Sequence, residues 1–156
     1  SQNPQNITAR RLIGHWQIAA RDWDAAIDTL EELRGRIGDR DAALLAELSY
    51  AYTGAGDADT GTIYGKAAYA LAPTNPAASD AYGWALYQQG KSDPALQLLE
   101  KAASIAPGRA DLRWHLGQAY ADLDRTAEAA TQIRAALADP AFGDRVAAAA
   151  ALKALG

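Results

Sequence analysis

The only two histidines of the chain are His15 and His115, and one of them has a carboxylate at helical spacing. Asp111 precedes His115 by one helical turn, so the two side chains can meet on one face of a helix. An imidazole beside a carboxylate can act as an acid–base pair or supply half of a metal site. The sequence contains no HExxH motif and no cysteine that would add ligands. We therefore expect a polar surface or groove pair, and we predict no catalytic residue, no metal and no cofactor.

The segment GAGDADTG, residues 54–61, has the composition of a ligand-binding loop. A phosphate-binding loop would follow a strand and end in Gly-Lys and a hydroxyl residue, and this segment does neither. A calcium-binding loop would need its glycine one position after Gly61 and a glutamate in place of Ala68. We interpret the segment as a turn between two helices.

Composition narrows the class of protein to which these residues belong. The 156 residues are enough for one ordinary domain, and abundant alanine favours helices. The net charge is −4 and the only basic pair is Arg10-Arg11, which argues against a nucleic-acid partner. No apolar run approaches the ~20 residues that a membrane-spanning helix needs, so we expect no membrane insertion.

A repeated pattern supplies the elements that position these side chains. The stretch YGWALYQQGKSDPALQLLEKAASIAP, residues 82–107, recurs at steps of 34 or 35 residues. Each copy has an apolar residue followed by a small one: Ile13-Gly14, Leu48-Ser49, Tyr82-Gly83 and Leu116-Gly117. Each also has a small residue that opens a second helix (Ala26, Gly61, Ala95 and Ala129), and two copies close with Pro73 and Pro107.

Within each copy, apolar residues recur at helical spacing on two segments, which predicts a pair of helices. In the third copy these helices are expected at about 77–89 and 94–105. Asp93, before Pro94, is expected to be the N-cap of the second helix. Asp24 and Asp59 are expected to cap the equivalent helices.

Glycines at two kinds of position predict how tightly the helices pack. Gly83 and Gly117 are expected to let the two helices of a pair approach closely. Gly65 is different, because Leu30, Leu99 and Ile133 occupy its position in the other copies. A helical glycine costs about 1 kcal/mol relative to alanine. The helix around Gly65 is therefore expected either to pack very closely on a bulky neighbour or to be the loosest of the stack.

In this repeated pattern the chain resembles the tetratricopeptide repeat family over about residues 7–139. The resemblance implies an all-α, right-handed α-solenoid of four helix pairs whose first helices line a concave, partner-binding face. A helix after the fourth pair is expected to cap the stack, the alternative being a partner-binding arm. The expected segments are a disordered lead-in at 1–6, repeat units at 7–41, 42–75, 76–109 and 110–139, and a capping helix at 144–155.

One stripe of each first helix is expected to face the groove, because it lies away from the paired small residue. The predicted groove residues are Arg11, His15, Tyr50, Thr53, Asp80, Trp84, Tyr87, Gln88, Trp114, Gln118 and Asp122. Tyr50, Trp84, Tyr87 and Trp114 are expected to form an aromatic band of the kind found at binding hot spots. For Trp84 and Trp114 a core position remains the alternative. Core positions are expected for Tyr52, Tyr82 and Tyr120, and packing within the first unit for Trp16 and Trp23.

These residues predict a non-catalytic protein–protein interaction scaffold that binds a peptide or helical segment in an aromatic-lined groove. One subclass of the family grips a C-terminal carboxylate with inward basic residues. Here only Arg11 is basic, which argues against that ligand. The alternative is a structural solenoid segment that self-associates, through its helix ends, within a larger bacterial envelope or exopolysaccharide assembly. An enzyme that uses Asp111 and His115 is the third hypothesis.

The last two units are similar to the C-terminal part of long bacterial tetratricopeptide proteins, a similarity carried by GWALYQQG, residues 83–90, and by the short final helix. It leaves the bacterial cytoplasm and the periplasm as alternative locations for a soluble protein. The identity of the protein or peptide partner stays open.

Overall fold

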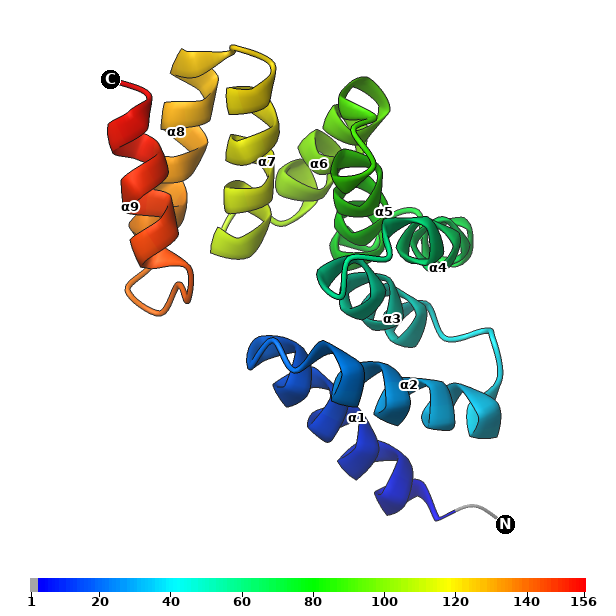
Figure 1. The fold of residues 1–156 in the computed structure, drawn as a ribbon. Coiled ribbons are helices and arrows are strands. Elements are labelled where there is room, and N and C mark those ends of the chain that lie inside the picture. The colour runs from blue at the N-terminus through cyan, green and yellow to red at the C-terminus, as the bar shows by residue number, and fades with distance from the viewer. Residues whose placement is uncertain (1–2) are drawn as a thin grey trace.

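The computed structural model of the chain describes residues 3–156, and every regular element in that range is an α-helix (Figure 1). The helices are α1 (Pro4–Ala19), α2 (Trp23–Ile37), α3 (Ala42–Gly54), α4 (Ala58–Leu71), α5 (Pro76–Gln88), α6 (Ser92–Ile105), α7 (Ala110–Asp122), α8 (Thr126–Leu137) and α9 (Arg145–Ala154). None of these helices is both long and apolar enough to cross a membrane.

The helices pack as consecutive pairs that form a right-handed solenoid, as predicted. α1 packs on α2, α3 on α4, α5 on α6 and α7 on α8, and α9 lies against α8 at the end of the stack (Figure 1). Each later first helix also contacts the pair before it. Since the first helices α1, α3, α5 and α7 contact one another in succession, they form the inner row of the curve. Residue-level unit boundaries at 7–41, 42–75, 76–109 and 110–139 stay a prediction.

The N-terminal segment differs from the expected disordered lead-in at 1–6. Residues 1–2 of that lead-in lie outside the described residues, but α1 already begins at Pro4. The side chain of Asn3 accepts a hydrogen bond from the Gln5 N–H at 3.1 Å, and proline suits the first helical position. This cap extends the helix over residues 4–6.

The second helices begin two residues earlier than predicted. Asp24, Asp59 and Asp93 lie in the first turns of α2, α4 and α6, so their assignment as N-caps was wrong. In α4 the cap is Asp57, whose Oδ1 accepts the Thr60 N–H at 3.0 Å. GAGDADTG is accordingly the end of α3, a turn and the first turn of α4.

Close approach of helices at the glycines is confirmed. A Cβ atom on Gly83 would lie 2.9 Å from the Leu98 Cβ, and one on Gly117 would lie 2.7 Å from the Ile133 Cγ1. At Gly65 a Cβ would lie 2.7 Å from the Cα of Tyr82 in the next pair. Of the two alternatives for the helix around Gly65, the structure therefore shows the close packing.

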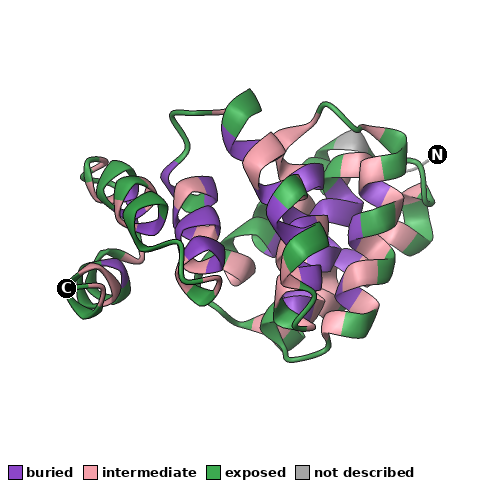
Figure 2. Cartoon of the chain, turned by 90° about the horizontal axis from the view of Figure 1, so that it is seen from above, coloured by how far each residue is buried: buried purple, intermediate pink, exposed green. Residues whose placement is uncertain are grey.

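The core consists of small and aliphatic side chains between successive helices, and Figure 2 shows buried residues on the sides where helices meet. Of the tyrosines expected in the core, Tyr120 is buried, whereas Tyr52 and Tyr82 are half-buried. Trp23 packs over Gly54, as expected for a residue of the first unit. Trp16 does not pack there, because its side chain is 65% exposed on the outer side of α1.

Candidate partner-binding groove

Four rings from three successive first helices form a row on the inner side of the curve, in which three rings stack and the fourth is tilted by 42°. His115 on α7 stacks on Trp84 of α5, with ring centroids 4.0 Å apart and planes 11° from parallel. Tyr87, one turn further along α5, stacks on Trp84 at 5.0 Å. Tyr50 of α3 lies at 6.3 Å from the His115 ring. We call Tyr50, His115, Trp84 and Tyr87 the aromatic column; all four side chains are half-buried.

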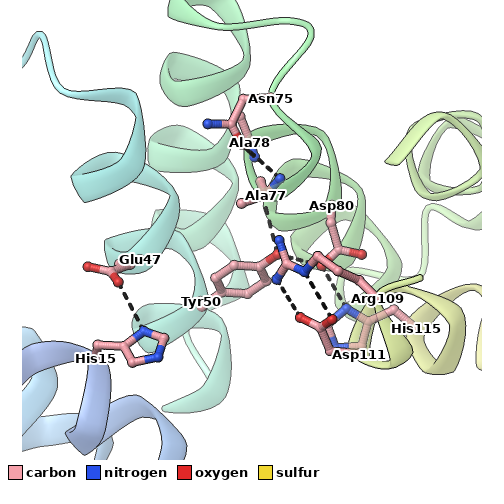
Figure 3. A network of polar contacts seen from close by, with 10 residues as sticks. All are labelled: His15, Glu47, Tyr50, Asn75, Ala77, Ala78, Asp80, Arg109, Asp111 and His115. Atoms are coloured by element: carbon pink, nitrogen blue, oxygen red, sulfur yellow. Dashed lines mark hydrogen bonds and ion pairs between the residues drawn. The ribbon is translucent and has the colours of Figure 1, made fainter. Parts of the chain in front are cut away.

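A buried carboxylate holds one end of the aromatic column together (Figure 3). The Tyr50 hydroxyl donates a hydrogen bond to the Asp80 Oδ2 at 2.5 Å, and the His115 Nδ1 lies 2.7 Å from the same oxygen. Asp80 is fully buried, and its Oδ1 has no hydrogen-bond partner among the described residues. Burying a carboxylate is costly unless its partners compensate for the lost water. Asp80 thus ties α3, α5 and α7 to one another.

The surroundings shift the protonation of two members of the aromatic column. Burial by itself would lower the pKa of His115, but the charge and hydrogen bond of Asp80 outweigh it and raise that pKa above its ordinary value. Burial and the neighbouring Asp80 both raise the pKa of Tyr50, so its hydroxyl stays protonated. His115 is therefore the group in the column that titrates nearest to neutral pH.

Polar side chains border the other end of the column. The Tyr87 hydroxyl donates a hydrogen bond to the Asp122 Oδ2 at 2.5 Å, which links α5 to the end of α7. Asp122 and Gln88 are exposed, and Gln118 is half-buried with its Nε2 3.4 Å from the Trp114 carbonyl oxygen. The column thus meets solvent beside groups that can accept and donate hydrogen bonds.

The predicted residues of the first unit lie beside the Tyr50 end. The exposed His15 places its Nδ1 3.3 Å from a Glu47 carboxylate oxygen, as Figure 3 shows. Burial raises the pKa of Glu47 despite the neighbouring His15. Arg11 is paired with Asp41, the N-cap residue of α3, so it joins α1 to α3.

Three predicted groove residues are buried and offer almost no surface to a partner. Asp80 is the carboxylate described above. Thr53 lies against Gly61 of α4, because helix pairing turns it towards its own second helix. Trp114 is 8% exposed and packs edge-to-face on Phe142, 6.5 Å between centroids, in the cluster that joins α7 and α8 to α9. Trp114 therefore occupies a core position, which was the alternative to a groove position.

The expected pairing of Asp111 with His115 is not present. The Asp111 carboxylate receives hydrogen bonds from Arg109 at 2.6 and 3.2 Å, and His115 pairs with Asp80 instead. His115 occupies the repeat position of Ala81 and Glu47, which faces the preceding first helix. That periodicity was the available signal for His115 as a member of the column.

The candidate groove offers groups that can recognise a partner. Within residues 3–156 no three or more histidine and carboxylate side chains gather as a metal ion would require. The aromatic column supplies apolar ring surface, and Asp122, Gln88 and His15 supply polar edges. Such a surface is suited to binding a segment of another molecule that presents apolar or aromatic side chains with polar groups beside them.

Comparisons with known proteins agree with the geometry. A tetratricopeptide repeat family model matches residues 86–155. A search of curated proteins found no match. Among solved structures, TTC0263, a thermophilic TPR protein of Thermus thermophilus, is 24% identical with a TM-score of 0.79, over 96% of this chain and 80% of that one.

Two structures of MamA are also similar to the chain. MamA AMB-1 is 29% identical with a TM-score of 0.62, over 84% of this chain and 76% of that one. MamA MSR-1 is 25% identical with a TM-score of 0.63, over 96% of this chain and 94% of that one. The similarity thus extends over nearly the whole stack.

Proposed function

We propose that the chain binds a peptide or helical segment of another protein along its concave face. The chain carries tetratricopeptide repeats and folds as their solenoid, which is the fold of protein-interaction scaffolds. The bound segment lies across the first helices α3, α5 and α7. The chain acts without catalysis, by holding its partner.

The aromatic column is the single observation that carries this proposal. Its rings come from three helix pairs, so a segment lying on it contacts several repeats at once. The rings are already held by stacking and by the Asp80 hydrogen bonds. A partner therefore loses little affinity to the ordering of these side chains, which is the usual cost of burying flexible residues.

The polar surroundings define the chemistry of the segment. Arg11 is already paired with Asp41. Arg109, which lies beside Tyr50 in Figure 3, is paired with Asp111, so neither arginine is free to clamp a terminal carboxylate. Half-buried rings favour apolar or aromatic anchor side chains, and Asp122 and Gln88 favour polar groups beside them. An amphipathic helix or a short extended segment with such anchors has the required pattern.

A selection experiment tests the proposal. Peptides are selected from a displayed library on the immobilised chain, and the best binder is titrated against Trp84→Ala and Tyr87→Ala variants. We expect each variant to lose at least about tenfold in affinity, as hot-spot truncations do.

The matched control is Trp16→Ala, which removes an exposed indole of α1 that does not belong to the column. It is expected to bind as the unaltered chain does, and circular dichroism establishes that all variants are folded. Equal binding by all three variants and the unaltered chain would place the binding site elsewhere and contradict the proposal.

A further inference from the structure

The outer side of α1 carries an apolar face at the N-terminal end of the stack. Leu12 is 48% exposed, Ile13 44% and Trp16 65%, and Ala9 beside them is also exposed. In Figure 1 α1 is the outermost helix at this end of the stack. We call Ala9, Leu12, Ile13 and Trp16 the α1 face; no element within residues 3–156 covers it.

The same face is an interface in every later first helix. The repeat positions of the α1 face are occupied by Leu44, Glu47, Leu48 and Ala51 in α3, by Ala78, Ala81, Tyr82 and Ala85 in α5, and by Leu112, His115, Leu116 and Ala119 in α7. All twelve of these residues are buried or half-buried by the preceding pair. The position and the composition of the α1 face are therefore those of a surface that is covered by another helical element.

Trp16 shows that this body does not stack as the repeats do. Its counterparts Ala51, Ala85 and Ala119 are all fully buried. Replacing a buried methyl group by an indole in such a close contact would push the helices apart. The occupant of the α1 face must instead present a hollow for a large ring.

The same side of α1 carries a shallow, open depression. It is mostly apolar and is lined by Gln5, Thr8, Ala9 and Leu12. These residues have the i, i+3, i+4, i+7 spacing of the four-residue hole that receives a side chain from a facing helix. Ala9 and Thr8 are small, which leaves room for an indole.

The spacing of the indole and the hollow fits a two-fold axis. Trp16 lies one turn after Leu12, and the hollow is centred near Thr8, one turn before it. When two copies of α1 pack antiparallel with Leu12 on the axis, Trp16 of each enters the hollow of the other. We propose that the α1 face is the dimer interface of this chain, formed by a second copy in this antiparallel arrangement.

The charges at the margin of the face permit this contact. Arg10 is paired with Glu32, and Arg11 with Asp41, within the same chain. The two copies therefore approach without uncompensated arginines opposite each other. One helix of this length is about 24 Å long, which gives an interface smaller than that of a permanent dimer and hence a reversible, concentration-dependent one.

This inference concerns a surface separate from the groove, and its test does not depend on a groove ligand. Sedimentation analysis of the unaltered chain from about 1 µM to about 1 mM, the range of weak interfaces, is expected to show a monomer–dimer equilibrium. Trp16→Ala is expected to raise the dissociation constant at least tenfold. Ile63→Ala, which truncates an equally exposed side chain on α4, is the matched control and is expected to leave it unchanged.

Cross-linking tests the antiparallel geometry, because the chain has no cysteine of its own. With a short bismaleimide, Leu12→Cys is expected to cross-link to itself. Gln5 and Ala19 are exposed and lie one heptad before and after Leu12, so Gln5→Cys is expected to cross-link to Ala19→Cys and much less to itself, with Trp16 kept in both variants. Self-cross-linking of Ala19→Cys with no product between positions 19 and 5 would contradict the arrangement. A monomer at every concentration would assign the α1 face to another occupant and overturn the proposal.

Discussion

Asp80 accounts for much of the shape of the inner surface. A fully buried carboxylate needs partners that replace water, and Asp80 takes them from both neighbouring helix pairs, Tyr50 on one side and His115 on the other. His115 in turn forms one face of the stack on Trp84. The polar and the aromatic contacts of the groove are thus one connected cluster.

The protonation of His115 gives a pH dependence to stability. Its pKa is raised in the folded chain, because the Asp80 contact outweighs burial. A raised folded pKa means that the protonated form favours folding. The contribution of His115 to the free energy of unfolding is complete below its pKa in the unfolded chain, about 6.5. This contribution disappears as the pH rises through the pKa of His115 in the folded chain. We predict that the free energy of unfolding in urea falls between pH 6 and pH 8.

The control for this prediction is His115→Gln, which removes the titrating group and leaves the other histidine. The difference in unfolding free energy between the two proteins is expected to be larger at pH 6 than at pH 8. A difference that stays constant, or grows with pH, would show that His115 does not titrate as the Asp80 contact requires.

Tyrosine hydroxyls at the two ends of the column should contribute unequally. Tyr50→Phe removes one of the two groups that contact the buried Asp80 Oδ2 and leaves His115 as the other. Losing a hydrogen bond to a charged group costs about 1.5–3 kcal/mol. Tyr87→Phe removes a bond to the exposed Asp122, where water replaces it, so the loss should be about 0.5 kcal/mol or less. Chemical denaturation measures both, and equal losses would contradict the special role of Asp80.

The sequence predicted part of this cluster. The repeat period identified Tyr50, Trp84 and Tyr87 as inward residues, because it returns the same helical position in each copy. It did not identify the pairing of His115 with Asp80, since these residues lie on different helices and only the angle between α5 and α7 decides which side chains meet. The spacing of one helical turn predicted Asp111, on the same helix, as the partner of His115 instead.

At the level of the helices, glycine positions set how closely the pairs pack. Gly65→Ala would normally add helix propensity, but here the new Cβ would meet the backbone of Tyr82. We predict a loss of about 1–3 kcal/mol from overpacking. Gly35→Ala is the matched change in α2, where no other element lies within 4 Å of the new methyl group, and it should stabilise by about 0.5–1 kcal/mol. Thermal unfolding of both variants measures these changes in stability. A Gly65→Ala variant that is more stable than the unaltered chain would contradict the close packing at Gly65.

Helix type and pairing followed from periodicity, whereas helix starts did not. In the second repeat both Asp57 and Asp59 are good capping residues by type, and only the three-dimensional turn selects Asp57. Trp16 was expected to pack within the first unit, but its side chain is exposed. Its exposure follows from its place on the first helix of the described stack, where no preceding pair covers it.

Across the whole molecule, the two ends of the solenoid meet. Arg21, in the turn between α1 and α2, pairs with Asp144, the N-cap residue of α9. Arg21 has a positive φ of 59°, at the turn position where Gly56 and Gly90 occur in the second and third units. The curve of the solenoid brings these residues together across 123 positions of sequence, which no local pattern predicts.

The last helix should stabilise its own end of the stack selectively. Deleting residues 144–156 removes α9, which packs against Trp114, Ala136 and Phe142 in the cluster at that end of the stack. Because repeat proteins are stabilised by nearest neighbours, we predict faster amide hydrogen exchange in α7 and α8 and little change in α3 and α4. Uniform acceleration across the chain would instead indicate that the stack unfolds as one unit, and no acceleration would show that α9 is not a cap.

The central claim is that a partner segment binds on the aromatic column, and the indole N–H signals test it most directly. The chain has four tryptophans, of which only Trp84 belongs to the column. In ¹H–¹⁵N spectra recorded while a selected peptide is added, the Trp84 signal is predicted to shift to saturation, and the signals of Trp16 and Trp23 are predicted to stay in place. Saturable binding that shifts Trp16 or Trp23 and leaves Trp84 unchanged would contradict the account.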